Sequence, residues 1–286
     1  MVISMERKQK RAVLFVFLAS LLFSIGGLCV KLIPWSALAI NGARNLIGIV
    51  VIGAYLLISK HKLKWNFPVV MGALSTLGTT TLYTIANKLT TAANAIVLQF
   101  TAPVFVILFM ILIFHVKPKK LDVLTCAVVL FGVMLFFIDG LRAGNMLGNL
   151  VAVLSGVCYS GVFLMNSSEK ADAMSSVFFG QLAAAVIFAP FCFQETDFSP
   201  VPMAALLALG ALQVGLAYIF LSLGIRYTPP VTASLITGLE PVLNPIWVAV
   251  FYGEHISATA FAGAVIVVGA IVGYNVLKSR RSKAAV

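Results

Sequence analysis

The sequence has few charged residues, and acidic residues are the scarcest of them. Only 10% of the 286 residues are charged, with 9 Asp and Glu against 20 Lys and Arg. A soluble domain is about a quarter charged, so this composition excludes an ordinary soluble globular protein. Hydrophobic residues make up 61% of the chain, which is more than one globular core can bury.

The sequence also lacks the common motifs of catalytic and metal sites. Its 4 cysteines stand singly inside apolar stretches, without CxxC or metal-ligand spacing. No HExxH, GxSxG, P-loop or dinucleotide-binding motif is present, and no soluble stretch is long enough for a nucleotide-binding domain. We therefore expect no enzyme, no cofactor and no bound metal. The 3 histidines lie at the ends of apolar stretches: His61, His115 and His255.

What the chain does contain is a series of apolar stretches, each long enough for a helix to cross a ~30 Å hydrocarbon layer. We expect an all-α integral membrane protein with ten transmembrane helices. The expected spans cover residues 11–33, 36–59, 67–88, 92–115, 121–139, 146–166, 173–193, 203–225, 230–252 and 257–277. The basic, then apolar N-terminus has no A-x-A-like cleavage site and is interpreted as a retained first span.

The net charge of +11 is typical of a nucleic-acid-binding protein, but its distribution indicates a membrane orientation instead. With ten spans and both termini in the cytoplasm, sixteen of the 20 basic residues fall in cytoplasmic segments. Only Lys31, Lys88 and Arg142 fall in outer loops. The positive-inside rule favours this topology, with the lipid bilayer and no nucleic acid as partner.

An internal repeat relates the two halves of the chain. A shift of 138 residues lays Pro103 on Pro241 and "ANKLTTAANAIVLQFTAPVF" on "GIRYTPPVTASLITGLEPVL". We expect repeats at 11–143 and 144–278, with cytoplasmic tails at 1–10 and 279–286. Because each half has an odd number of spans, the second would be inverted in the membrane. Inverted repeats are typical of alternating-access transporters.

The sequence resembles the EamA-type family of the drug/metabolite transporter (DMT) superfamily. The resemblance rests on "LQFTAPVFVILFMILIF", "GLEPVLNPIWVAVFYGE", "ARNLIGIVVIGAYLL" and "AGAVIVVGAIVG" within the two five-helix halves. It implies ten helices, cytoplasmic termini and a central cavity. It also implies transport across the bacterial inner membrane, usually export, of amino acids or other small metabolites.

Arg44 and Glu240 are the two full charges expected deep within the spans. A charge at that depth usually faces a cavity or a partner charge. Three interpretations remain open. The two residues pair and hold helices together; Arg44 binds the carboxylate and Glu240 the amine of a substrate; or Glu240 takes up and releases a coupling proton.

Prolines interrupt two repeat-related spans near their middle. Pro103, Pro241 and Pro245 each remove a helical hydrogen bond. Paired interrupted helices often mark a transporter's binding site, although such kinks can also serve packing alone. Other polar residues expected to line the cavity are Gln99, Asn244, Tyr83, Tyr159 and Gln213.

The expected function is secondary transport of a small polar or amphipathic metabolite. The first candidate substrate is an amino acid or related compound, which would be exported. The alternatives are a passive facilitator and a proton-coupled importer or exporter of a cationic amine. We expect a monomer, with a homodimer as the alternative. The GxxxG spacing of Gly269 and Gly273 allows close helix packing, which we expect to occur within the monomer.

Overall fold

A computed structural model describes residues 2–90, 92–138, 145–243, 247 and 257–284. Helices and turns account for this part of the chain, and it contains no strand. The first half contains α1 (Val2–Phe23), α2 (Gly26–Leu32), α3 (Ala37–Ser59), α4 (Phe67–Leu89), α5 (Ala92–Gln99), α6 (Ala102–Leu112) and α7 (Lys120–Phe137). The second contains α8 (Met146–Met165), α9 (Ala173–Phe188), η1 (Ala189–Gln194), α10 (Pro200–Ala208), η2 (Leu209–Leu216), α11 (Ala217–Ile225), α12 (Pro230–Ile236) and α14 (Ala258–Ala284).

Within the described residues, 8 helical stretches are long and apolar enough to cross a membrane. The chain is thus a multi-pass membrane protein, as the composition indicates, and its regular secondary structure within the described ranges is helical. The 18-residue helix α7 lies where the fifth span is expected. Residues 230–243 form a shorter apolar stretch where the ninth begins. Helix α1 begins at Val2 and α14 ends at Ala284, so helices extend into both of the expected tails.

Side-chain caps set the start of several helices. Ser36 Oγ accepts a hydrogen bond from the Ala39 N–H at the start of α3, and Asn66 Oδ1 does the same for Val69 in α4. Asn145 caps α8 through the Leu147 N–H. Each cap satisfies a backbone donor that has no partner inside its helix, which explains why these helices begin within two residues of the expected positions.

Three expected spans are interrupted. Turns at residues 24–25, 100–101 and 237–238 separate α1 from α2, α5 from α6, and α12 from the helical residues 239–243. Pro103 lies in the first turn of α6, where a missing N–H costs no helical hydrogen bond. The Thr237 carbonyl, four residues before Pro241, accepts from the Glu240 N–H at 3.0 Å and from Ser20 Oγ at 3.5 Å.

The outer surface of the bundle is apolar, and several polar side chains are buried inside it together with the hydrophobic core. Large apolar side chains are exposed, with Leu57 at 81% and Ile58 at 83%. Asn41, Arg44 and Gln181 are instead buried in the bundle. Lipid tails can solvate the apolar surface, and polar side chains must then find partners between helices.

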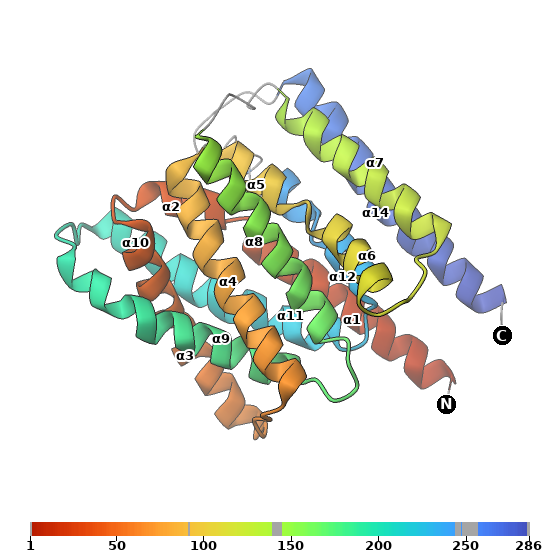
Figure 1. Cartoon of the computed structure of the whole chain (residues 1–286), viewed down its shortest axis with the longest axis horizontal. Coiled ribbons are helices and arrows are strands. Elements are labelled where there is room, and N and C mark those ends of the chain that lie inside the picture. Colours follow the sequence, from red (N-terminus) through yellow and green to blue (C-terminus); the bar gives the residue numbers. More distant parts are fainter. Residues whose placement is uncertain (1, 91, 139–144, 244–246, 248–256, 285–286) are drawn as a thin grey trace.

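Figure 1 shows the arrangement of the helices. Helices α3, α4, α8 and α9 pack together, and α7 and α14 form a pair at one edge. The N-terminal end of α1 and the C-terminal end of α14 lie at the same end of the molecule. No described residue approaches within 4 Å of the position that a Cβ would take at Gly269 or Gly273. The described chain therefore provides no neighbour for the close packing expected of these glycines.

Candidate functional site

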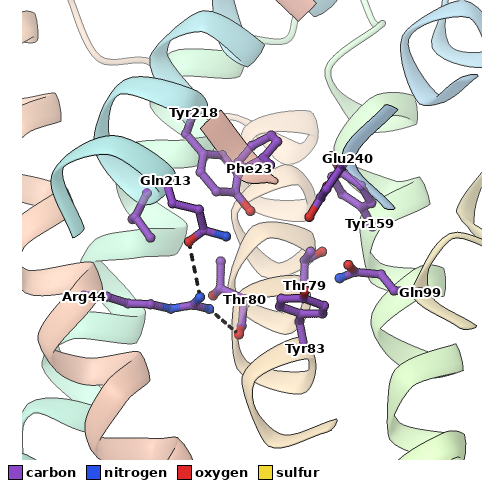
Figure 2. Close-up of a pocket in the computed structure, with 11 residues that line it drawn as sticks. Phe23, Arg44, Thr79, Thr80, Tyr83, Gln99, Tyr159, Gln213, Tyr218 and Glu240 are labelled. Atoms are coloured by element: carbon purple, nitrogen blue, oxygen red, sulfur yellow. Dashed lines mark hydrogen bonds between the residues drawn. The ribbon is translucent and has the colours of Figure 1, made fainter. Parts of the chain in front are cut away.

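A small cavity of about 30 Å³ lies among the helices where the expected polar residues converge. Its lining comes from the end of α1, from α3, α4, α5, α8, η2 and α11, and from the segment after α12. Figure 2 shows the lining residues, which are Phe23, Arg44, Thr79, Thr80, Tyr83, Gln99, Tyr159, Gln213, Val214, Tyr218 and Glu240. In this conformation the cavity is far smaller than the ~300–1,000 Å³ of typical small-molecule sites, so a ligand larger than water requires it to widen.

Arg44 is 1% exposed, and its hydrogen-bond partners in the described part of the chain are neutral oxygen atoms. Its Nη2 donates to the Thr80 carbonyl at 2.7 Å and to Asn41 Oδ1 at 3.2 Å. Its Nε donates to Asn41 Oδ1, and its Nη1 to Gln213 Oε1, both at 3.4 Å. The guanidinium therefore links α3, α4 and η2, and the carbonyl and amide dipoles replace part of its lost hydration.

Glu240 lies two residues after the interruption at Thr237 and Gly238 and faces the same cavity. Among the described residues its carboxyl accepts no hydrogen bond, and it forms no ion pair with Arg44 (Figure 2). The pairing interpretation thus does not describe this conformation. An unpaired carboxyl facing a cavity is a group that can bind a substrate or carry a proton.

Two tyrosines leave further polar atoms unpaired. The hydroxyls of Tyr83 on α4 and Tyr159 on α8 have no hydrogen-bond partner in the described chain, although the residues are only 4% and 5% exposed. Buried hydroxyls are usually hydrogen-bonded. These two lie at the cavity with Glu240, so a ligand or water inside it can reach all three.

Gln99, the last residue of α5, is held by a relay of hydrogen bonds. Its Nε2 donates to Ser155 Oγ at 2.7 Å, and Ser155 donates to the Thr79 carbonyl at 3.2 Å. This relay connects the interruption after α5 to α8 and α4. The hydrogen bonds of Gln99 therefore connect helices at the cavity wall.

The π-helical segment η2 places the predicted Gln213 beside Tyr218, which was not predicted from the sequence. Gln213 lies in η2, and Tyr218 follows five residues later in α11. In an α-helix that spacing separates side chains by about 140°, whereas the wider π-turn brings residues i and i+5 together. Phe23, Thr79, Thr80 and Val214 are the other lining residues outside the predicted set.

The predicted residues are largely brought together. Arg44, Tyr83, Gln99, Tyr159, Gln213 and Glu240 all line the cavity. Asn244 and Pro245 lie outside the described residues. Pro103 and Pro241 are buried beside the interruptions and are not part of the lining. No group of three potential metal ligands occurs within the described ranges.

A family model for EamA-like transporters matches residues 10–138 and 146–276, which is most of the chain. The chain belongs to the EamA-like transporter family. The predicted resemblance is therefore confirmed, and it is consistent with the DMT superfamily. As a family member the chain is a multi-pass membrane transporter.

Similarity to individual proteins agrees with this assignment. The chain is 24% identical over 295 residues to a protein of Clostridium kluyveri named an uncharacterized transporter, with 93% of this chain and 94% of that protein covered. A crystal structure with 20% sequence identity superimposes with a TM-score of 0.79, covering 94% of this chain and 98% of the other. This structural likeness establishes the shared fold.

Proposed function

We propose that this EamA-like protein is a secondary transporter that moves a small polar or amphipathic metabolite through the cavity by alternating access. The observation that carries the proposal is an unpaired carboxyl, Glu240, at a cavity whose opposite wall holds the buried guanidinium of Arg44. Buried charges of this kind are costly in a membrane and mark substrate or ion pathways. The protein is proposed to be a transporter and not an enzyme.

The proposed architecture has ten spans in two inverted five-helix repeats. The two separate stretches matched by the family model, residues 10–138 and 146–276, support a duplication. So do the interruptions at residues 100–101 and 237–238, which nearly coincide when Pro103 is aligned with Pro241. Interrupted helices in corresponding positions are a recurring feature of transporter sites.

The proposed location is the bacterial inner membrane, with both termini in the cytoplasm and the protein as a monomer. The concentration of basic residues in the proposed cytoplasmic segments supports this orientation. The N-terminal end of α1 and the C-terminal end of α14 lie at the same end of the molecule (Figure 1), which also agrees with this orientation.

The first candidate substrate is an amino acid or a related compound, moved outward. The cavity offers Glu240 for an ammonium group, and Arg44 lies on the opposite wall. A cationic amine is the second candidate, favoured by the hydrogen bonds that already occupy Arg44. Glu240 is the candidate carrier of a coupling proton, and a passive facilitator is the alternative to coupled transport.

A metabolite screen followed by transport assays tests this proposal. Thermal stabilisation of the purified protein identifies binders, because a ligand that binds only the folded state raises its stability. Uptake of each binder is then measured in proteoliposomes with and without a pH gradient. We expect specific uptake, and a response to the gradient if Glu240 carries protons. If the compounds that bind are never transported across the membrane, the transport proposal is contradicted.

A further inference from the structure

We infer that the substrate is an organic cation, which binds through its ammonium group to Glu240 among the aromatic rings of the cavity. This inference rests on the proposed transport function and narrows its substrate class. It assigns Arg44 to the structure of the cavity wall and not to recognition of a substrate carboxylate. The inference follows from the hydrogen-bonding capacity that the lining residues have left.

Arg44 has little of that capacity left. A guanidinium has five N–H donors. Four of them donate to Asn41, Thr80 and Gln213: the one on Nε, one on Nη1 and both on Nη2. One N–H on Nη1 remains. Two-point binding of a carboxylate, the arrangement that makes Arg a good anion receptor, would require Arg44 to break bonds that link three helices.

The unused capacity lies around Glu240. Its carboxyl has no hydrogen-bond partner in the described chain, and the hydroxyls of Tyr83 and Tyr159 are equally unpaired. Glu240 lines the same cavity as Tyr83, Tyr159 and Tyr218. The free groups at this end of the cavity are therefore oxygen atoms, which an ammonium group can contact as a donor.

Aromatic rings complete the site. Phe23, Tyr83, Tyr159 and Tyr218 all line the cavity (Figure 2), and Phe23 and Tyr218 are in edge contact with ring centroids 5.0 Å apart. The face of an aromatic ring attracts a desolvated cation, and alkylated ammonium groups are bound in this way. A carboxyl beside several such rings matches the charge and the apolar substituents of an amine.

The same features disfavour a zwitterion. A substrate carboxylate would lose its hydration on entering the cavity and would find one remaining N–H of Arg44 in exchange. Removal of the carboxylate from an amino acid removes that cost and leaves the ammonium group unchanged. We therefore expect an amine to bind better than the amino acid from which it differs only by the carboxylate.

Matched pairs of ligands test the inference. Binding to the purified full-length protein is measured by titration calorimetry for phenethylamine and phenylalanine, for isopentylamine and leucine, and for their N-methylated forms. Each amine is expected to bind at least tenfold more tightly than its amino acid. Equal or tighter binding of the amino acids overturns the inference, as does failure of every amine to bind.

Variants locate the site. Glu240→Gln is expected to weaken amine binding at least tenfold, whereas Glu169→Gln, the same change at an exposed loop residue, leaves it unchanged. Tyr159→Phe keeps the ring and should retain most binding, and Tyr159→Leu removes the ring and should lose it. Retained folding is verified by thermal unfolding of each variant. Amine affinity that is identical in wild type, Glu240→Gln and Tyr159→Leu overturns the assignment.

Transport separates this inference from the function on which it rests. Proteoliposomes that exchange the amino acids but not the amines would leave the transporter intact and overturn the cation assignment. Amines that bind in a Glu240-dependent manner and never cross the membrane would support the ammonium site and contradict transport.

Discussion

The guanidinium of Arg44 and the carboxyl of Glu240 face one cavity without pairing. Within the described chain, the shortest hydrogen bond of Arg44 is to the Thr80 carbonyl, at 2.7 Å. The positive charge is thereby held by the bundle itself, and the carboxyl remains free for another partner. The predictions below follow from this division of roles and from the packing that supports it.

Arg44 should contribute to stability through the helices that it connects. Arg44→Met removes four hydrogen bonds and leaves the buried oxygens of Asn41, Thr80 and Gln213 with fewer partners. We expect a loss of about 2–4 kcal/mol in the free energy of unfolding, measured by thermal or denaturant unfolding in detergent. Arg226→Met, at an exposed position, should change stability little. An Arg44→Met protein as stable as wild type would contradict the structural role.

Two glycines in α3 should respond in opposite ways to the same substitution. A Cβ at Gly42 would lie 2.5 Å from the backbone carbonyl of Phe188, whereas nothing lies within 4 Å of a Cβ at Gly53. Gly42→Ala is expected to destabilise the protein by roughly 1–3 kcal/mol because the helix backbones must separate. Gly53→Ala should be neutral or stabilising by up to ~1 kcal/mol, since alanine favours the helix.

Unfolding midpoints of the two variants check this contrast. The pair controls for helix propensity, because both substitutions are Gly to Ala within one helix. Equal effects at the two positions would show that the close approach of α3 to the end of α9 does not exist.

Two of the three interrupted spans meet at Gly238 and Phe100. A Cβ at Gly238 would lie 2.4 Å from Phe100 Cζ, so Gly238→Ala should force the two segments apart. We expect a loss of roughly 1–3 kcal/mol in stability together with reduced binding of any cavity ligand. Phe100→Leu in the same chain shortens the obstructing side chain and should recover part of both losses. Additive effects of the two substitutions would argue against the contact.

A hydrogen-bonded pair links the segment between α3 and α4 to the start of α9. His61 Nε2 lies 2.7 Å from Asp172 Oδ2, and Asp172 also accepts from the Ser175 hydroxyl. The His61 side chain is 29% exposed, so we expect a modest coupling energy of about 0.5–1 kcal/mol. A double-mutant cycle with His61→Ala and Asp172→Ala measures it. A coupling energy of zero would show that the contact adds nothing to stability.

Much of the fold and site follows from apolar length and from isolated polar residues. Eight of the expected spans correspond to long apolar helical stretches in the described residues, because apolar length and caps such as Ser36 and Asn66 are local signals. Arg44 and Glu240 were identifiable because a charge is rare in an apolar stretch. Their convergence on one cavity is a tertiary relation between segments far apart in the sequence.

Other features depend on tertiary packing and escaped prediction. Tyr218 reaches the cavity because η2 adopts π-helical spacing, and no local residue pattern distinguishes this from an α-helix. Thr80 contributes its backbone carbonyl to Arg44, a role to which its side chain gives no clue. The first expected span corresponds to the apolar helical stretch Lys8–Leu32, but its turn at residues 24–25 lacks a proline that could have predicted it.

The central claim is that this protein transports its substrate through the cavity at Glu240. Substrate counterflow in proteoliposomes tests it most directly, with wild type, Glu240→Gln and Glu169→Gln reconstituted at equal amounts. We expect wild type and Glu169→Gln to accumulate labelled substrate and Glu240→Gln to fall by about tenfold, equivalent to ~1.4 kcal/mol. Accumulation by Glu240→Gln equal to that of wild type, or accumulation by wild type no greater than in protein-free liposomes, would contradict the account.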